Sequence, residues 1–279
     1  MYFDCADNLI GDDPPMACRG LSSASLTGCN GGWDMQWWDQ EKFNVRLEWG
    51  DAAVRYAAKD VECIIIVDVM SFSTCVSLAV DNGAQVYPYP WKEASAISFA
   101  NNIGARLASD DRLSDAGGFS LSPASIRKIE QGEKLVLPSP NGSAISFLAR
   151  DVAAGVTVFN GCFRNLTQTA KACRNFGRIL VVPCGERWPD GTLRPAIEDY
   201  AAAGGIIAAI GHDCCSPEAA GAVAAWQQLN LLSLRECASA RELQQRGFQE
   251  DVDLCLGLDS ATRACQLQGN FYAAGSERG

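Results

Sequence analysis

The chain has 279 residues, with 23 lysine and arginine residues against 33 aspartate and glutamate residues, and a net charge of −10. This length suits one large α/β domain or two small ones. The negative charge argues against nucleic acid and against anionic membranes as main partners, because both are negatively charged themselves. It does not argue against a small anionic substrate, since a metal ion or a few arginines can reverse the local field.

The thirteen cysteines do not form the pattern of a disulfide framework. Their number is odd, the sequence has no CxxC motif, and Cys63, Cys75 and Cys173 lie inside apolar stretches. This arrangement is typical of small buried side chains in a reducing compartment.

The first 35 residues show no hydrophobic period and are rich in glycine, serine, aspartate and cysteine. They lack the apolar core of a signal peptide. We expect residues 1–40 to form an N-terminal extension that is disordered or loosely docked, and residues 41–279 to form the folded domain. No stretch approaches the ~20 apolar residues of a membrane span, so we expect a cytoplasmic protein without a membrane partner.

The folded part alternates short apolar strands with helices. The run from Ile64 to Val67 is β-branched and too short for a helix, which is typical of a strand buried on both faces of a parallel sheet. Repeated strand–turn–helix units with short turns predict a three-layer α/β/α fold with a largely parallel sheet. The other strands are expected at 43–50, 85–89, 105–108, 134–137, 155–159 and 178–182, with one more near 252–256. The helices are expected at 51–59, 76–83, 91–103, 145–150, 166–176 and 196–210, and in most of the last seventy residues.

Four of the predicted strands end in polar loops, at 68–74, 138–143, 160–165 and 184–199. In an open α/β sheet, ligands bind beyond the carboxyl ends of the strands and against helix N-termini. An acid followed by hydroxyl groups, as in the first loop, suits a metal ion and an anionic ligand. Helix capping alone would also explain the polar residues of the second and third loops.

The fourth loop, GERWPDGTLRPAIED, is more strongly charged than capping requires. Acids near a helix N-terminus favour its dipole, but here two arginines and further acids accompany the Glu198–Asp199 pair. Together with Asp68 and Asp111, these acids would make an oxygen-rich site for Mg²⁺. The single histidine, His212, follows a helix end, and the sequence contains no nucleophile elbow, P-loop or complete GxGxxG motif, which argues against histidine-based catalysis.

From about Asn44 to Ala273 the sequence resembles the 2-phosphosulfolactate phosphatases, or ComB-like proteins. The resemblance rests on an ordered set of motifs. The family's D-V-x-R-A-S-T, G-E-R, G-F-x-x-x-N-S-P, T-N-G-T and E-D…A-G motifs are similar, in that order, to residues 68–74, 110–112, 118–123, 140–143 and 198–204.

The resemblance implies a Mg²⁺-dependent phosphatase that releases phosphate from 2-phospho-3-sulfolactate to give 3-sulfolactate, a step toward coenzyme M in some archaea. It implies that the metal is bound by Asp68, Glu198 and Asp199. The catalytic residues would be Asp68 together with Glu186 or Asp111, either of which could orient a water molecule. The small anionic phosphorylated substrate would be bound by Ser71, Ser73, Thr74, Arg112, Asn141, Gly142, Ser143, Arg187 and Arg194, with the arginines facing its carboxylate and sulfonate.

The chain departs from the family pattern at three places. Ser71 stands where the family has arginine, Asp110–Asp111 stands for Gly-Glu, and the asparagine before Ser-Pro is missing. Losing a guanidinium group would weaken the binding of a polyanion by a few kcal/mol, on the scale of charged hydrogen bonds. Two alternatives therefore stay open: a related phosphorylated hydroxy acid as substrate, and a catalytically impaired anion-binding or regulatory protein on the same fold. The sequence also leaves open whether the chain forms a homo-oligomer.

Overall fold

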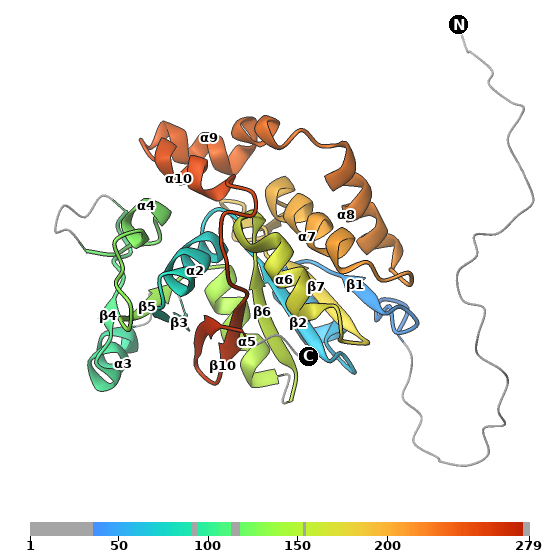
Figure 1. Cartoon of the computed structure of the whole chain (residues 1–279), viewed down its shortest axis with the longest axis horizontal. Coiled ribbons are helices and arrows are strands. Elements are labelled where there is room, and N and C mark those ends of the chain that lie inside the picture. The colour runs from blue at the N-terminus through green and yellow to red at the C-terminus, as the bar shows by residue number, and fades with distance from the viewer. Residues whose placement is uncertain (1–35, 91–93, 113–117, 153–154, 276–279) are drawn as a thin grey trace, which may run out of the picture. The chain divides into compact units, whose positions relative to one another are not determined.

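The computed structural model describes residues 36–90, 94–112, 118–152 and 155–275 (Figure 1). Residues 1–35, which make up most of the expected N-terminal extension, lie outside these ranges, and so does the expected start of a helix at 91–93. No helix in the described ranges combines the length and the apolar character needed to cross a bilayer.

The described residues form a nine-stranded, mostly parallel sheet in the order β1-β7-β2-β6-β10-β11-β3-β5-β4. The apolar run recognised in the sequence forms an interior strand of this sheet, where Ile65 aligns in parallel with Val181 on one side and with Phe159 on the other. The strands are β1 (Val45–Leu47), β2 (Cys63–Val67), β3 (Gln85–Tyr89), β4 (Arg106–Leu107), β5 (Lys134–Pro138), β6 (Thr157–Gly161), β7 (Ile179–Pro183), β10 (Cys265–Gln268) and β11 (Phe271–Ala274).

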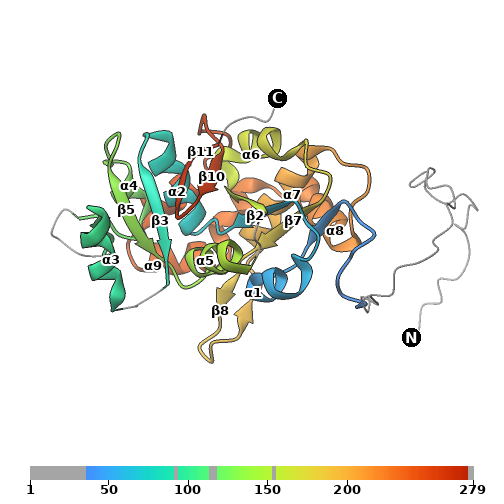
Figure 2. The same cartoon turned by 90° about the horizontal axis from the view of Figure 1, so that it is seen from below.

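Helices cover both faces of the sheet, which confirms the predicted three-layer α/β/α architecture (Figure 2). Alternate residues of β2 point to opposite faces. Ile65 packs against α6 (Leu166–Cys173) and α7 (Ile197–Ile210), whereas Ile64 packs against α5 (Gly142–Val152) and the helix at 50–57. The helices are α1 (Gly50–Ala52, which continues as a π-helix over Ala53–Ala57), α2 (Phe72–Asp81), α3 (Ser95–Ile103), α4 (Pro123–Ile126), α5 (Gly142–Val152), α6 (Leu166–Cys173), α7 (Ile197–Ile210), α8 (Pro217–Gln228), α9 (Ala238–Gln245) and α10 (Gln249–Cys255), with 3-10 turns at Phe163–Asn165 and Leu231–Glu236.

Two features of the C-terminal region differ from the sequence-based prediction. The strand expected near Val252–Leu256 is wrong, because α10 occupies this stretch. The alternating Val252, Leu254 and Leu256 imitate a strand, but Asp251, Val252 and Cys255 form the buried stripe of a helix. The antiparallel hairpin β10–β11 was not predicted, and it joins the two parallel halves of the sheet by pairing with β6 and β3.

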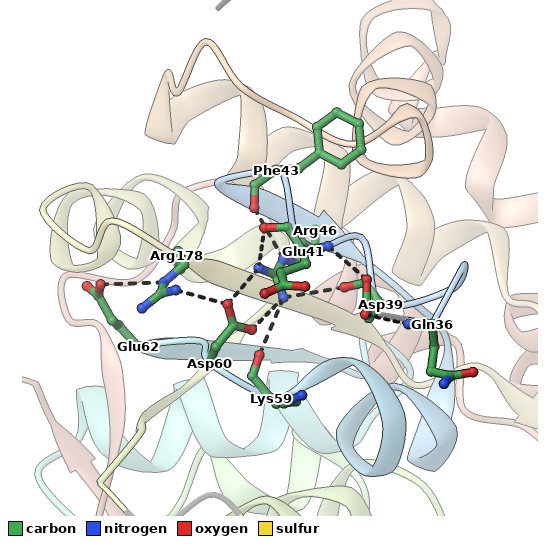
Figure 3. A network of polar contacts seen from close by, with 9 residues as sticks. All are labelled: Gln36, Asp39, Glu41, Phe43, Arg46, Lys59, Asp60, Glu62 and Arg178. Atoms are coloured by element: carbon green, nitrogen blue, oxygen red, sulfur yellow. Dashed lines mark hydrogen bonds and ion pairs between the residues drawn. The ribbon is translucent and has the colours of Figure 1, made fainter. Parts of the chain in front are cut away.

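A buried arginine fixes the edge strand β1 to the segment before it (Figure 3). Arg46 is only 1% exposed, and its Nη1 and Nη2 donate to the two carboxylate oxygens of Asp60 at 2.9 and 3.2 Å. Arg178 also donates to Asp60, at 2.9 Å. The remaining N–H groups of Arg46 donate to the backbone carbonyl oxygens of Asp39, Glu41, Phe43 and Lys59. Neither arginine is among the residues that line the cavity described next, so we assign this network a structural role.

Candidate active site

Three of the four polar loops predicted at the carboxyl edge of the sheet come together there. They are the turn after β2, the turn after β5 and the segment from β7 to α7, and they meet at a cavity of about 190 Å³. The remaining loop, at 160–165, is not among the lining segments, and the Asn165 side chain caps its own turn there by accepting from Cys162 N at 2.9 Å. The cavity is lined by Met70, Asp110, Arg112, Leu121, Pro140, Glu186, Ser239, Glu242, Leu243 and Arg246.

Asp68 lies at the end of β2 and binds the first turn of α5. Its Oδ2 accepts from Gly142 N at 2.8 Å, and its Oδ1 accepts from Phe72 N at 3.3 Å. A Cβ atom at Gly142 would lie 2.7 Å from Asp68 Oδ2 and 2.5 Å from the Phe72 ring, so only glycine allows this close approach. Burial raises the pKa of Asp68 to about 6, although both N–H groups and the charge of Arg112 lower it.

Asp199, in the first turn of α7, connects two of the strand ends. Its Oδ1 accepts from Val69 N at 2.8 Å and its Oδ2 accepts from Gly185 N at 2.9 Å. Burial raises the pKa of Asp199 well above its usual range, and the charges of Asp68 and Glu198 raise it further. Glu198 is itself only 2% exposed. The site therefore concentrates buried carboxyl groups that a cation would stabilise.

The arrangement fits Mg²⁺ in ligand type and in charge, but it is not a preformed coordination cage. Carboxylates are the side chains that Mg²⁺ prefers, and the ion usually keeps several water molecules and substrate phosphate oxygens as ligands. Within the described residues, no three histidine, cysteine, aspartate or glutamate side chains are placed to hold one ion together. Both oxygens of Asp68 and of Asp199 also already accept backbone N–H groups.

Glu186 begins β8 (Glu186–Arg187) and lines the cavity. Its Oε2 accepts a hydrogen bond from Asn141 Nδ2 at 3.0 Å, which orients the carboxyl group. Burial raises the pKa of Glu186 to about 7, with a further rise from the charge of Asp68. A carboxyl group with a pKa near neutrality can both accept and return a proton at physiological pH.

Arg112 is the best-anchored cation of the cavity. Its Nη1 donates to Asp251 Oδ2 at 3.0 Å, and its Nη2 donates to Ser71 Oγ at 3.1 Å. Asp251, on α10, is 1% exposed, and its Oδ1 accepts from Ser122 Oγ at 2.7 Å and Ala124 N at 2.9 Å. Ser71, which stands at the family's arginine position, thus helps to orient another arginine. Sequence reasoning missed Asp251, although the helical spacing of its buried neighbours could have revealed it.

The hydroxyl groups of the predicted substrate-binding residues Ser73, Thr74 and Ser143 are buried and bonded to backbone. Ser73 Oγ accepts from Asp68 N at 2.8 Å, and Thr74 Oγ1 donates to Val69 O at 2.8 Å. Ser143 Oγ donates to Tyr89 O at 2.7 Å. These hydroxyls shape the turns that carry the site, and their role as substrate ligands stays a prediction.

The remaining predicted residues lie at or outside the cavity rim. Arg194, on β9 (Leu193–Arg194), donates to the lining residue Ser239 at 3.1 Å. Arg187 is exposed and donates to Gly191 O within its own hairpin. Asp111 is exposed, and it is the preceding residue, Asp110, that lines the cavity.

One wall of the cavity comes from α9, which sequence reasoning did not assign to the site. It contributes Ser239, Glu242 and Leu243, and Arg246 follows directly after it. α9 does not follow a strand of the sheet, so the rule that ligands bind at strand ends could not identify it. Its helical amphipathic pattern was the available signal, but that pattern alone reads as ordinary packing.

The sequence comparisons agree with this architecture. The family model described as 2-phosphosulpholactate phosphatase matches residues 52–270, a range that contains every residue of the site named above. A 2-phosphosulfolactate phosphatase from Methanothermobacter thermautotrophicus is 31% identical over 196 residues, which cover 69% of this chain and 80% of that protein. The chain belongs to the 2-phosphosulpholactate phosphatase family.

Proposed function

We propose that this protein is a phosphatase that hydrolyses the phosphate ester of 2-phospho-3-sulfolactate and releases phosphate and 3-sulfolactate. Membership of the family and the name of the relative support this activity. The observation that carries the proposal is that Glu186 and Arg112 line the same small cavity at the carboxyl edge of the sheet. One supplies a proton-transfer group and the other an anion-binding group.

Arg112 would bind the anionic substrate. A guanidinium group can form paired hydrogen bonds with a carboxylate, a sulfonate or a phosphate. Its contacts with Asp251 and Ser71 fix the side chain, which is only 11% exposed, before any substrate arrives. A pre-positioned cation loses little conformational freedom on binding, so more of its interaction energy contributes to affinity.

Glu186 would move the proton of the attacking water. Hydrolysis forms a bond between the water oxygen and phosphorus and breaks the bond between phosphorus and the ester oxygen. Glu186 accepts the proton that the water loses and can return it to the departing ester oxygen. The hydrogen bond from Asn141 holds the carboxyl group in one orientation for this task.

Magnesium dependence is part of the proposal. Asp68, Glu198 and Asp199 would hold the ion. All three are buried, and the raised pKa values of Asp68 and Asp199 are consistent with a need for a cation. When bound, Mg²⁺ would neutralise negative charge on the transferring phosphoryl group. A cytoplasmic location remains a prediction from the sequence, and a place on a route toward coenzyme M remains a prediction of the family resemblance.

The proposal is tested by phosphate release from 2-phospho-3-sulfolactate, with Mg²⁺ and with EDTA, beside a panel of other phosphorylated hydroxy acids. We expect turnover of the sulfonate substrate that requires Mg²⁺. If only a different compound of the panel is hydrolysed, the proposed phosphatase activity holds and that compound replaces 2-phospho-3-sulfolactate as the proposed substrate. A complete lack of turnover would favour the anion-binding or regulatory alternative. Turnover that EDTA does not change would contradict the proposed dependence on Mg²⁺.

A further inference from the structure

A second arginine lines the cavity beside Arg112. Arg246 lies at the end of α9, and the two are the only cationic side chains among the lining residues that the structure describes. The guanidinium carbons of both lie 5.7 Å from the ring centroid of Phe248. One aromatic ring therefore lies within cation–π range of both arginines that line the cavity.

The two arginines differ in how firmly they are held. Arg112 is bound to a carboxylate that is 1% exposed, whereas Arg246 pairs with Glu242 on the same helix, at 3.2 Å, and both partners are at least half exposed. An exposed pair of this kind contributes little to stability. Arg246 can therefore leave Glu242 for an incoming anion at little cost.

The charge of the cavity makes such an exchange useful. Besides the two arginines, the lining contains the acids Asp110, Glu186 and Glu242. The proposed substrate carries a carboxylate and a sulfonate in addition to its phosphate. A single guanidinium group cannot pair with all of these groups, and the acids would repel those left unpaired.

We propose that Arg246 is a further substrate-binding residue, which pairs with a non-reacting anionic group of the substrate, either the sulfonate or the carboxylate. This proposal rests on the proposed function. Arg112 provides the fixed half of the anion-binding pair and Arg246 the movable half. Glu242 holds Arg246 when no substrate is bound.

The test compares three variants by steady-state phosphate release. Arg246→Gln should raise KM by about tenfold to a hundredfold, with kcat changed by less than about twofold, because it removes a charged contact that is equal in the ground and transition states. Arg241→Gln is the matched control, since Arg241 is exposed on α9 and is not a lining residue, and it should leave KM unchanged. Glu242→Gln should lower KM, because it frees Arg246 and removes a negative charge from the cavity.

A second substrate identifies the anionic group that Arg246 binds. If 2-phospholactate, which lacks the sulfonate, loses as much affinity in Arg246→Gln as the sulfonated substrate does, the partner is the carboxylate. A loss confined to 2-phospho-3-sulfolactate identifies the sulfonate. The proposal is overturned if KM stays within about twofold on both substrates, or if Glu242→Gln raises KM as Arg246→Gln does, which would indicate a merely structural ion pair.

Failure of the proposed function gives a different result. In that case the wild-type chain releases no phosphate from either compound. Titration calorimetry with 2-phospho-3-sulfolactate and the same variants then decides the inference about Arg246, because the Kd should rise in Arg246→Gln and stay constant in Arg241→Gln. Equal Kd values in all variants would reject it.

Discussion

Asp251→Asn tests whether α10 holds Arg112, the proposed substrate-binding arginine, in place. Asparagine has the same shape, and its carbonyl oxygen can still accept from Ser122 or Ala124. Asparagine lacks the negative charge that faces Arg112. The ion pair that it would break is buried, because the Arg112 side chain is 11% exposed and that of Asp251 is 1% exposed. Breaking a buried ion pair costs about 3–5 kcal/mol, and we expect about 3 kcal/mol because the other hydrogen bonds persist. This corresponds to a fall in Tm of roughly 6–12 °C for a domain of this size.

The assay combines thermal unfolding with kinetics measured well below the unfolding transition. If Asp251 positions Arg112, KM should rise by about tenfold while kcat changes little, since a misplaced guanidinium group weakens substrate binding. Asp253→Asn is the control on the same helix, because Asp253 is 49% exposed in its pair with Arg235 and should cost at most about 1 kcal/mol. A variant that loses stability but keeps the wild-type KM would refute the positioning role. If Asp251→Asn unfolds with the wild-type free energy, the ion pair between Arg112 and Asp251 does not contribute to stability as expected.

Three further predictions concern the other parts of the account. Burial raises the pKa of Glu186 from 4.5 to about 7, so the folded state binds this proton more tightly than the unfolded state does. The protonated carboxyl group therefore contributes its full share of the unfolding free energy below about pH 4.5, and this contribution is lost as the pH rises through about 7. Glu186→Gln should therefore raise the unfolding free energy at pH 8 by about 3 kcal/mol and leave it unchanged at pH 4, as measured by urea unfolding, and an equal effect at both pH values would contradict this. Gly142→Ala should lower the unfolding free energy by about 1–3 kcal/mol, because the new Cβ atom would clash with Phe72 and Asp68. In the control Gly118→Ala the Cβ atom meets open space, so the unfolding free energy should change by at most about 0.5 kcal/mol in the same urea measurement. Similar values for both variants would disprove the close approach at Gly142. Arg46→Ala should lower the unfolding free energy by about 3–5 kcal/mol and leave KM unchanged, because it breaks a buried ion pair. Arg178→Ala should lower the unfolding free energy by at most about 1 kcal/mol, because the Arg178 side chain is 47% exposed. Equal losses in the two variants would show that burial does not decide the strength of these ion pairs.

The main features of the fold could be predicted because they depend on local patterns. The β-branched run at Ile64–Val67 indicated a buried strand of a parallel sheet, and its parallel pairing with a strand on each side confirms this. The acids Asp68, Glu186 and Asp199 could be assigned to one region because strand ends in a parallel sheet meet at one edge. Family motifs strengthened this assignment but did not supply contacts.

The parts that could not be predicted depend on contacts between distant segments. The helical spacing around Asp251 could have indicated its burial, but its partner Arg112 lies far away in the sequence, and no local pattern shows such a pair. The hydroxyl groups of Ser73 and Ser143 looked like anion ligands, but whether a hydroxyl bonds to backbone or to a ligand depends on turn geometry that the sequence does not state. Arg246 reaches the cavity through helix packing, which a rule based on strand ends does not consider.

The most direct test of the central claim is phosphate release from 2-phospho-3-sulfolactate by the wild-type chain and by Glu186→Gln, measured side by side in Mg²⁺ near pH 7. The account predicts turnover by the wild type and a kcat lower by about 10²–10⁴-fold in the variant, with the variant still folded by circular dichroism. Equal turnover by the two proteins would show that this cavity does not carry the reaction in the way derived from its geometry.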